Sequence, residues 1–240
     1  MDGKLGSRQN FSMDFVSVII PAYNREAYLG EAIESALRQT RPPDEIVVVD
    51  DGSTDRTAEI AQSFGKTVRC LSQANQGAGA ARNAGLQATR GNLVAFLDSD
   101  DLWLERKLEI QIAFLQAHPE LDLVTCHMKS FLSPEIDPTT VPAFDEKAIA
   151  ACNSTSLLAR RKIFTRVGLF EAELRDGEFI DWFGRAQEKG IRYQILPDLL
   201  VLRRVHLTNT VHDRRRLHTA YAQVLKQRLD RQRQASGVKR

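Results

Sequence analysis

Short apolar runs alternate with longer amphipathic segments along the first half of the chain. Four of the runs have the length and composition of buried strands, at residues 15–20, 45–49, 66–71 and 93–97. Between them, apolar residues recur every three or four positions. This spacing predicts helices over residues 26–39 and 78–88, and a shorter helix that runs to Phe64 with Ser53 or Thr54 as its cap. Strands that alternate with helices are typical of βαβ units and a mainly parallel sheet.

The second half has a less regular pattern. A helix is predicted over residues 107–117 and a strand over residues 121–126, followed by a loop with three prolines at residues 133–142. Strands near residues 154–159 and 199–205 bracket a helix at residues 178–189. These elements extend the sheet of the first half. We therefore predict an α/β fold, a three-layer α/β/α sandwich with a mainly parallel central sheet.

The end of the chain is predicted to be a basic helix over residues 213–233. From Asp213 onward there are nine Lys or Arg and two Asp, although the net charge of the whole chain is only +2. Apolar residues lie on one side of this helix and arginines on the other, which favours docking on its own domain. The alternative is peripheral contact with an anionic membrane surface. Interleaved aromatic residues are almost absent, so nucleic acid is not an expected partner.

Composition is that of an ordinary globular domain, with 240 residues of which 42% are hydrophobic and 27% charged. No apolar stretch approaches the roughly 20 residues that span a bilayer, and the first 14 residues lack the pattern of a secretory signal. We therefore expect a cytoplasmic protein. Cys70, Cys126 and Cys152 are odd in number and widely spaced, which favours reduced thiols over disulfides or a zinc site.

Carboxylates follow two of the predicted strands directly. Asp50 and Asp51 come after the second strand, and Asp98, Asp100 and Asp101 come after the fourth. Such carboxylates repel one another near a core, and a divalent cation carrying a phosphate ligand would supply the missing counter-ion. Ligands of open α/β sheets bind beyond the carboxyl ends of the strands, so these side chains are expected to share one crevice with Asn24. Asp101 alone is also compatible with a position at the start of the next helix.

Four ordered motifs carry a resemblance to a known family. They are VSVIIPAYN at residues 16–24, EIVVVDDGSTD at 45–55, ARNAG at 81–85 and FLDSDDLW at 96–103. With them the chain resembles the family 2 glycosyltransferases, which are inverting enzymes with the nucleotide-sugar-binding A-type fold. The resemblance is clear over about residues 15–110 and continues faintly to about residue 210.

This resemblance implies a division of the chain. A flexible segment at residues 1–14 precedes a glycosyltransferase domain at residues 15–210. The nucleotide-sugar-binding half of that domain is residues 15–110, and the acceptor half is residues 111–210. The basic helix and tail occupy residues 211–240.

The resemblance also implies a set of donor and metal ligands. Asp51 is expected to hold the nucleobase, flanked by the loop Pro21, Ala22, Tyr23 and Asn24. The other residues expected near the nucleotide sugar are Asp50, Arg82, Asp98, Ser99 and Arg204. Asp100 is expected to bind Mg²⁺ or Mn²⁺, with Asp98 beside it and His206 completing the shell, because carboxylate and phosphate oxygens suit these ions. The metal would stabilise the departing nucleoside diphosphate.

The catalytic base is expected at the start of the helix that begins near residue 178. Many relatives carry Glu-Asp there, with the Asp as base, but this chain has Phe179 at the Asp position. Glu178 and Asp181 are three residues apart and hence on one helix face, so we expect one to be the base and the other to orient the acceptor. Glu178 is favoured because it retains the glutamate of the pair.

Three functional hypotheses follow. The first is metal-dependent, inverting transfer of a sugar from a nucleoside diphosphate sugar, expected to be a UDP-sugar, to an acceptor hydroxyl or other nucleophile. The acceptor is left open among a saccharide, a lipid-linked carrier, a small molecule and a peptide. The second is a nucleotide-sugar-binding protein made catalytically silent by Phe179. The third is a sugar-phosphate nucleotidyltransferase, which is disfavoured because the first strand is not followed by a Gly-rich loop with Arg or Lys.

Overall fold

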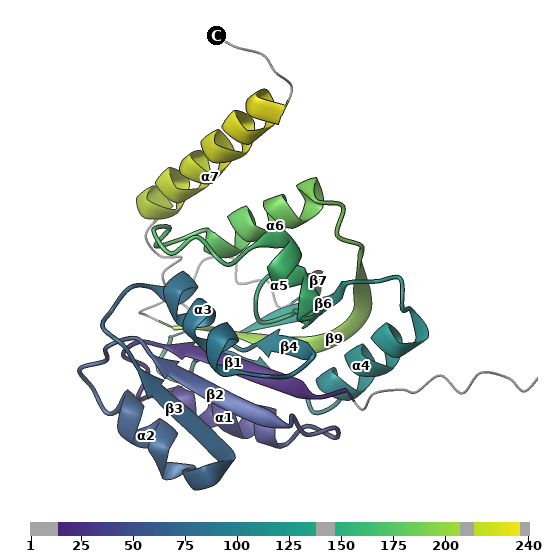
Figure 1. Cartoon of the computed structure of the whole chain (residues 1–240). Helices are drawn as coiled ribbons and strands as arrows, with labels where there is room; N and C mark the ends of the chain where they lie inside the picture. The colour runs from purple at the N-terminus through teal and green to yellow at the C-terminus, as the bar shows by residue number, and fades with distance from the viewer. Residues whose placement is uncertain (1–13, 138–146, 207–213, 236–240) are drawn as a thin grey trace, which may run out of the picture.

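A computed structural model describes residues 14–137, 147–206 and 214–235, and in these ranges nine strands form one sheet between two layers of helices (Figure 1). The strands are β1 (Val16–Ala22), β2 (Glu45–Asp50), β3 (Val68–Ser72), β4 (Leu93–Phe96), β5 (Leu102–Trp103), β6 (Leu123–Leu132), β7 (Ile149–Ala150), β8 (Leu158–Arg160) and β9 (Tyr193–Val205). The helices are α1 (Leu29–Leu37), α2 (Thr57–Ser63), α3 (Ala78–Ala88), α4 (Lys107–Ala117), α5 (Lys162–Val167), α6 (Glu178–Glu188) and α7 (Arg214–Ala235), with a 3-10 turn at Gly65–Thr67. The predicted α/β sandwich is confirmed.

The sheet has the order β3-β2-β1-β4-β8-β6-β9-β5, and β7 pairs with β6. Strands β3, β2, β1 and β4 are mutually parallel, so their carboxyl ends lie at one edge. Beyond β4, strand β8 joins antiparallel, and β6 and β9 run parallel to each other. All seven residues of β1 are buried, which fits a central strand covered on both faces.

Each face of the sheet has its own apolar layer. On one face, Leu29 and Ile33 of α1 and Leu108 of α4 pack on β1, β2 and β4. On the other, Phe164 of α5 and Trp182 of α6 stack at a ring-centroid distance of 5.1 Å, in a cluster that includes Val94 and Phe96 of β4. Helix α6, which carries the expected base, is therefore fixed by one of the largest buried side chains in the described part of the chain.

Strand β1 does not stop at Pro21, as the sequence pattern suggested, but continues to Ala22. Residues 15 and 19 accept hydrogen bonds from residues 93 and 97 on the β4 side, so Pro21 faces that side too. Pairing with β4 ends at Ile19, whereas pairing with β2 extends to Ala22. The proline nitrogen therefore lies where no ladder bond is required, and the strand tolerates it.

Two helix starts differ from their predicted positions. Helix α1 begins at Leu29 because a turn precedes it, in which the carbonyl of Arg25 accepts from the amide of Leu29 at 2.9 Å. Helix α2 begins at Thr57, and neither Ser53 nor Thr54 caps it. The carboxylate of Asp55 instead accepts from the Thr57 amide at 3.0 Å.

Asp101 does not begin a helix. Strand β5 lies between it and α4, and its carboxylate accepts from the backbone N–H of Arg204 at 3.0 Å. Asp101 thereby links the end of β9 to the acidic loop, which is the segment after β4 that carries Asp98, Asp100 and Asp101. Burial, followed by the charges of Asp100 and Asp98, raises the pKa of Asp101 well above its usual value.

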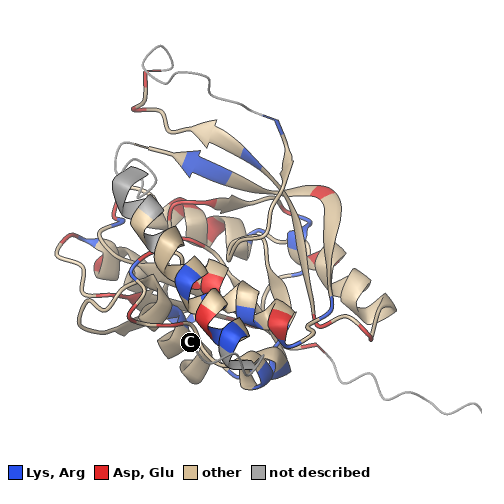
Figure 2. Cartoon of the chain, turned by 90° about the horizontal axis from the view of Figure 1, so that it is seen from above, with Lys and Arg blue, Asp and Glu red and all other residues tan. Residues whose placement is uncertain are grey.

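Helix α7 docks on α6 through ion pairs, as one of the two sequence interpretations proposed. Arg231 contacts Asp181 at 3.0 Å and Glu188 at 3.1 Å, and Arg228 lies 3.7 Å from Glu188. Figure 2 shows basic and acidic residues close together where the C-terminal helix crosses the body of the protein. In the described part of the chain, no helix has the length and apolar character needed to cross a bilayer.

Parts of several predictions lie outside the described residues. These parts are residues 1–13 of the N-terminal segment, residues 138–142 of the proline-containing loop, and residues 207–213 and 236–240 around the basic helix.

Candidate active site

A cavity of about 780 Å³ opens at the carboxyl ends of β1, β2 and β4. Segments far apart in the sequence line it, including the end of β1, the loops after β2 and β4, one side of α3, and the start of α6. Of the residues predicted from sequence, the lining includes Pro21, Ala22, Tyr23, Asp51, Arg82, Asp98, Ser99, Asp100 and Glu178. The structure places Asn24, Asp50, Asp181, Arg204 and His206 outside this lining.

Asp51 forms one wall of the cavity and is held by three donors. Its Oδ1 accepts from the Gln73 side chain at 2.7 Å and from the Gln76 amide at 2.9 Å, and its Oδ2 accepts from the Gly77 amide at 2.7 Å. The next residue, Gly52, has φ 77°, and a Cβ there would lie 2.9 Å from the backbone nitrogen of Asn75. The turn therefore requires glycine at this position.

Asn24 and Asp50 support this wall from outside the cavity. The side-chain oxygen of Asn24 accepts from the backbone N–H of Thr54 at 2.8 Å, and the backbone N–H of Asn24 donates to the Ser53 hydroxyl at 3.0 Å. Asp50 accepts from the Ser53 amide at 3.1 Å. These contacts join the loops after β1 and β2, so both residues support the Asp51 side of the cavity instead of lining it.

Arg82 on α3 connects the two sides of the cavity. One end of its guanidinium donates to Asp98 at 2.7 Å and to the Ser154 hydroxyl at 3.1 Å, and the other donates to Glu178. The residue is only 4% exposed. Burial by itself would lower the pKa of Arg82, but the carboxylates of Asp98 and Glu178 outweigh burial and raise it. Ser154 was not identified from sequence, because an isolated serine in a loop has no distinctive pattern.

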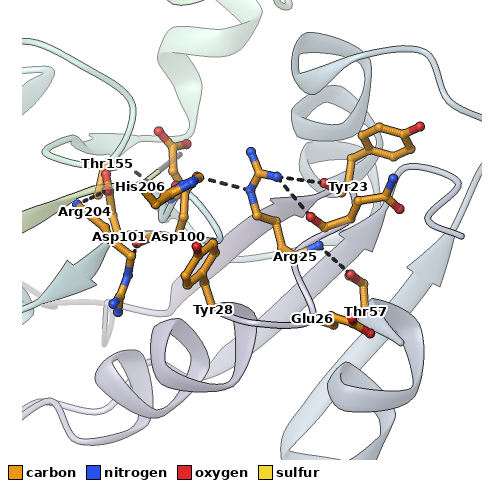
Figure 3. Close-up of polar contacts among 12 residues, drawn as sticks. Tyr23, Arg25, Glu26, Tyr28, Thr57, Asp100, Asp101, Thr155, Arg204 and His206 are labelled. Carbon is orange, nitrogen blue, oxygen red and sulfur yellow. Dashed lines mark hydrogen bonds and ion pairs between the residues drawn. The ribbon is translucent and has the colours of Figure 1, made fainter. Parts of the chain in front are cut away.

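Asp100 receives two nitrogen donors on one oxygen (Figure 3). Its Oδ2 lies 3.1 Å from Nε of Arg25 and 3.0 Å from Nε2 of His206. Burial would raise the pKa of Asp100, but the hydrogen bond from His206 and the charge of Arg25 lower it below its usual value. Arg25, which lines the cavity, was also missed from sequence. Its position directly after the motif VSVIIPAYN was the available signal.

Arg204 holds the acidic loop from behind. Its Nε donates to the backbone carbonyl of Asp100 at 3.1 Å, and the end of its guanidinium contacts Glu31. It also lies over the rings of Tyr28 and Phe131, 5.2 and 4.7 Å from their centroids. The expectation that Arg204 meets the diphosphate does not match this position, because its charge is directed away from the cavity.

The two candidate bases on α6 do not converge on one site. Glu178 lines the cavity and contacts Arg82. Asp181, one turn later, lies against Arg185 at 2.8 Å and Arg231 at 3.0 Å. Only the first turn of α6 reaches the cavity, and the docked helix α7 supplies Asp181 with a partner of opposite charge. Of the two candidate bases, therefore, Glu178 lines the cavity, whereas Asp181 forms an ion-pair contact between α6 and α7.

The donor atoms around Asp100 are compatible with Mg²⁺ or Mn²⁺. Asp100 Oδ2 and His206 Nε2 lie 3.0 Å apart, about the separation of neighbouring ligands in an octahedral shell with bonds of about 2.1 Å. The guanidinium of Arg25 already neutralises the same oxygen. In the described ranges no group of three or more His, Cys, Asp or Glu side chains is arranged to hold a metal. Such a site therefore depends on phosphate oxygens and water for its remaining ligands.

Comparison with known proteins identifies relatives of this chain. A family model described as glycosyl transferase family 2 matches residues 17–163. An uncharacterized glycosyltransferase of Rickettsia typhi is 31% identical over 223 residues, which covers 85% of this chain and 68% of the relative. The uncharacterized glycosyltransferase EpsJ of Bacillus subtilis is 32% identical over 183 residues, which covers 68% of this chain and 53% of EpsJ.

Solved structures of S. aureus TarS share the fold. The complex of TarS 1–349 with UDP has a TM-score of 0.66 and 27% identity, and covers 80% of this chain and 60% of that one. The complex with UDP-GlcNAc has a TM-score of 0.68 and 25% identity, and covers 83% of this chain and 61% of that one. This chain thus spans about 60% of the length of the TarS fragment. The family match ends at residue 163, so α6 and α7 lie beyond it.

Proposed function

Because the chain belongs to glycosyl transferase family 2, we propose that it transfers a sugar from a UDP-sugar to an acceptor nucleophile, with inversion at the anomeric carbon. One observation carries this proposal. A single cavity joins Asp51, Arg82, Asp98 and Asp100 to Glu178, a carboxylate from an element almost 80 residues further along the chain. The TarS complexes with UDP and UDP-GlcNAc support the choice of donor.

The donor half of the cavity matches the polarity of a nucleotide sugar. Asp51 offers its carboxylate to N–H and hydroxyl groups of the nucleoside, beside the exposed ring of Tyr23, which is available for stacking. Asp98 is held by Arg82 and Ser154, and its side chain is one third exposed, so it remains accessible to sugar or ribose hydroxyls. These residues orient the donor with its diphosphate toward the acidic loop after β4.

Mg²⁺ or Mn²⁺ would be held by Asp100 and His206 and would neutralise charge on the departing diphosphate. Two protein ligands plus phosphate oxygens and water form a usual coordination set for these ions. Removal of divalent cations with EDTA is expected to abolish turnover, and Mn²⁺ or Mg²⁺ is expected to restore it. Full activity after EDTA treatment would reject metal dependence while leaving the transfer reaction intact.

The acceptor half supplies the base. The acceptor oxygen attacks the anomeric carbon on the face opposite the diphosphate, the bond from that carbon to the diphosphate oxygen breaks, and the acceptor proton passes to Glu178. Arg82 holds the carboxylate of Glu178 at the edge of the cavity through a direct ion pair. One displacement of this kind inverts the configuration.

The silent-binding hypothesis fits the geometry less well. It assumes that the chain lost its base when phenylalanine took position 179. Phe179 is 93% buried and packs 5.9 Å from the ring of Trp182, so this position contributes to the core. Glu178 meanwhile lines the cavity. A carboxylate thus remains at the acceptor side without an Asp at position 179.

Glu178→Gln tests the proposal against Asp181→Asn. A panel of UDP-sugars is incubated with the protein, and the UDP that is released when the sugar passes to water or to an added acceptor is measured. The affinity for UDP is measured in parallel. Loss of a general base lowers turnover by about 10²–10⁴, so Glu178→Gln is expected to lose turnover while binding UDP normally. Asp181→Asn is expected to retain turnover. Equal turnover in wild type and Glu178→Gln, or UDP binding that is unaffected by Asp100→Ala, would contradict the proposed site.

A second proposal concerns helix α7, which we expect to contact an anionic lipid surface. Leu225 and Leu229 are four residues apart and are 61% and 46% exposed, whereas Tyr221, 46% exposed, lines the cavity. Lys226 is exposed on the same helix, and the sequence around it is strongly basic. Exposed apolar side chains flanked by cations favour the interface of an anionic bilayer.

Vesicle co-sedimentation tests this contact. Binding is expected to vesicles that contain phosphatidylglycerol and not to pure phosphatidylcholine, and Leu225→Glu is expected to weaken it. Gln223→Glu is the matched control, because it adds the same charge at another exposed position of α7. Equal binding to both lipids, or equal effects of both variants, would refute the contact.

A further inference from the structure

Arg25, in the loop after β1, contacts the acidic loop after β4 at Asp100, and neither the sequence motifs nor the proposed reaction accounts for it. We propose that Arg25 is an exchangeable counter-ion: it neutralises Asp100 in the ligand-free protein, is displaced from Asp100 by the divalent cation, and then binds the diphosphate of the donor. This inference rests on the proposed function, because it requires both a cation and a diphosphate at this site.

The contacts of Arg25 explain why it is exchangeable. Its Nε lies 3.1 Å from Asp100 Oδ2, and its Nη1 donates to the carbonyls of Tyr23 and Asn24 at 3.3 and 3.0 Å. Within the described ranges Arg25 pairs with the single carboxylate of Asp100, whereas the buried Arg82 is shared between two carboxylates. The Arg25 side chain is 19% exposed and lines the cavity, so its guanidinium is able to turn toward a bound ligand without unfolding the loop.

Asp100 Oδ2 is the atom for which Arg25 and the incoming cation compete. His206 approaches it from the buried side at 3.0 Å, and the His206 side chain is fully buried behind it (Figure 3). The approach from the cavity is taken by Arg25. A cation that binds Asp100 from the cavity must therefore replace the guanidinium, because two positive groups cannot share that approach without strong repulsion.

Displacement does not leave Arg25 without a partner when the donor is present. A diphosphate bound next to the acidic loop lies in the same cavity, and a guanidinium is well suited to phosphate oxygens. The backbone of Arg25 stays fixed because its amide donates to the Thr57 hydroxyl at 2.7 Å. The exchange thus makes cation binding and donor binding mutually favourable, which is a coupling between two ligands of one site.

The first measurement is the affinity for Mn²⁺ in the absence of nucleotide, and the EPR signal of free Mn²⁺ is its readout. Arg25→Gln removes the competing charge and is expected to bind Mn²⁺ about fivefold more tightly than wild type, at the low end of typical coupling energies. Arg175→Gln is the matched control. Arg175 also lines the cavity, but it contacts the side chain of Asn75 at 2.7 Å and not Asp100. Its removal is expected to leave Mn²⁺ affinity unchanged.

The second measurement is the affinity for UDP in the presence of EDTA, determined by isothermal titration calorimetry. Asp100→Asn frees Arg25 without a metal, so this variant is expected to bind UDP about fivefold more tightly than wild type. The double variant Asp100→Asn with Arg25→Gln is expected to lose that gain. Circular dichroism spectra that match wild type show that each variant is folded.

Each outcome is decisive. Tighter Mn²⁺ binding by Arg25→Gln but not Arg175→Gln, together with a UDP gain that requires Arg25, supports the exchange. Unchanged Mn²⁺ affinity in Arg25→Gln, or a UDP gain that persists in the double variant, overturns it while leaving the proposed function intact. Failure of every variant and of wild type to bind UDP, with or without Mn²⁺, overturns the proposed function and the exchange together.

Discussion

Arg82 is the residue whose loss has the most readily calculated effect. Arg82→Met keeps most of the apolar stem and removes the guanidinium, which contacts Asp98 at 2.7 Å and also Glu178. The Glu178 side chain is 11% exposed and that of Asp98 is 33% exposed. Two carboxylates then face one cavity without their shared cation, and the more buried one determines most of the cost.

The magnitude follows from this burial. Two unit charges about 4 Å apart interact by about 4 kcal/mol at an effective dielectric constant of about 20. Removing one partner of a buried pair typically costs about 3–5 kcal/mol. The contribution of Asp98 is discounted because solvent screens it. We therefore expect Arg82→Met to lower the free energy of unfolding by about 4 kcal/mol, and the melting temperature by about 10 °C for a chain of this length.

Urea unfolding at pH 7 measures the effect. Combining Arg82→Met with Glu178→Gln is expected to recover about half of the lost stability, since the more buried charge is gone. Arg82→Met with less than about 1 kcal/mol of destabilisation, or a double variant no more stable than Arg82→Met, would refute the assignment of Arg82 as the shared counter-ion.

The remaining predictions concern groups away from the donor. Burial lowers the pKa of Lys107 to about 8, so the unfolded chain holds this proton more tightly and the free energy of unfolding of the wild type should rise from pH 8 to pH 10. Lys107→Met should remove that rise. Parallel pH profiles of the two proteins in urea unfolding would contradict the prediction. Arg231→Gln removes contacts with Asp181 and Glu188, so it should lower stability by about 1 kcal/mol and speed trypsin cleavage within α7. Arg233→Gln is the control and should do neither, because the partner of Arg233 among the described residues is Asp230 of the same helix. Cys152 lines the cavity, but burial raises the pKa of its thiol to about 12. Iodoacetamide at pH 8 should therefore modify Cys152 far more slowly than free cysteine. Labelling as fast as that of free cysteine would contradict this.

The sequence was sufficient to predict the sheet and one half of the site. Apolar runs become strands because burial on both faces admits few other residues, and the predicted bounds of α3 and α4 match the structure. In a parallel sheet the carboxyl ends meet at one edge, so Asp51, Asp98 and Asp100 were expected together and do line one cavity. This part of the site follows from strand order alone.

Periodicity did not predict which side chains on the remaining elements face the cavity. Glu178 and Asp181 fit the same helical face by spacing, yet only Glu178 reaches the cavity, since α7 pairs with Asp181. Arg204 was expected at the diphosphate, but it holds the acidic loop from behind, and the partner of His206 in this structure is Asp100. In each case the deciding partner comes from a different element.

The sequence by itself determined the α/β fold, the strand ends that carry carboxylates and the position of the basic helix. Only the tertiary structure decided how those carboxylates are neutralised. Arg82 pairs with Glu178 across 96 positions of the chain, and Asp100 pairs with His206 across 106 and with Arg25 across 75. The physical reason is that burial and secondary structure depend mainly on nearby residues, whereas a buried charge takes its partner from whichever element packs against it.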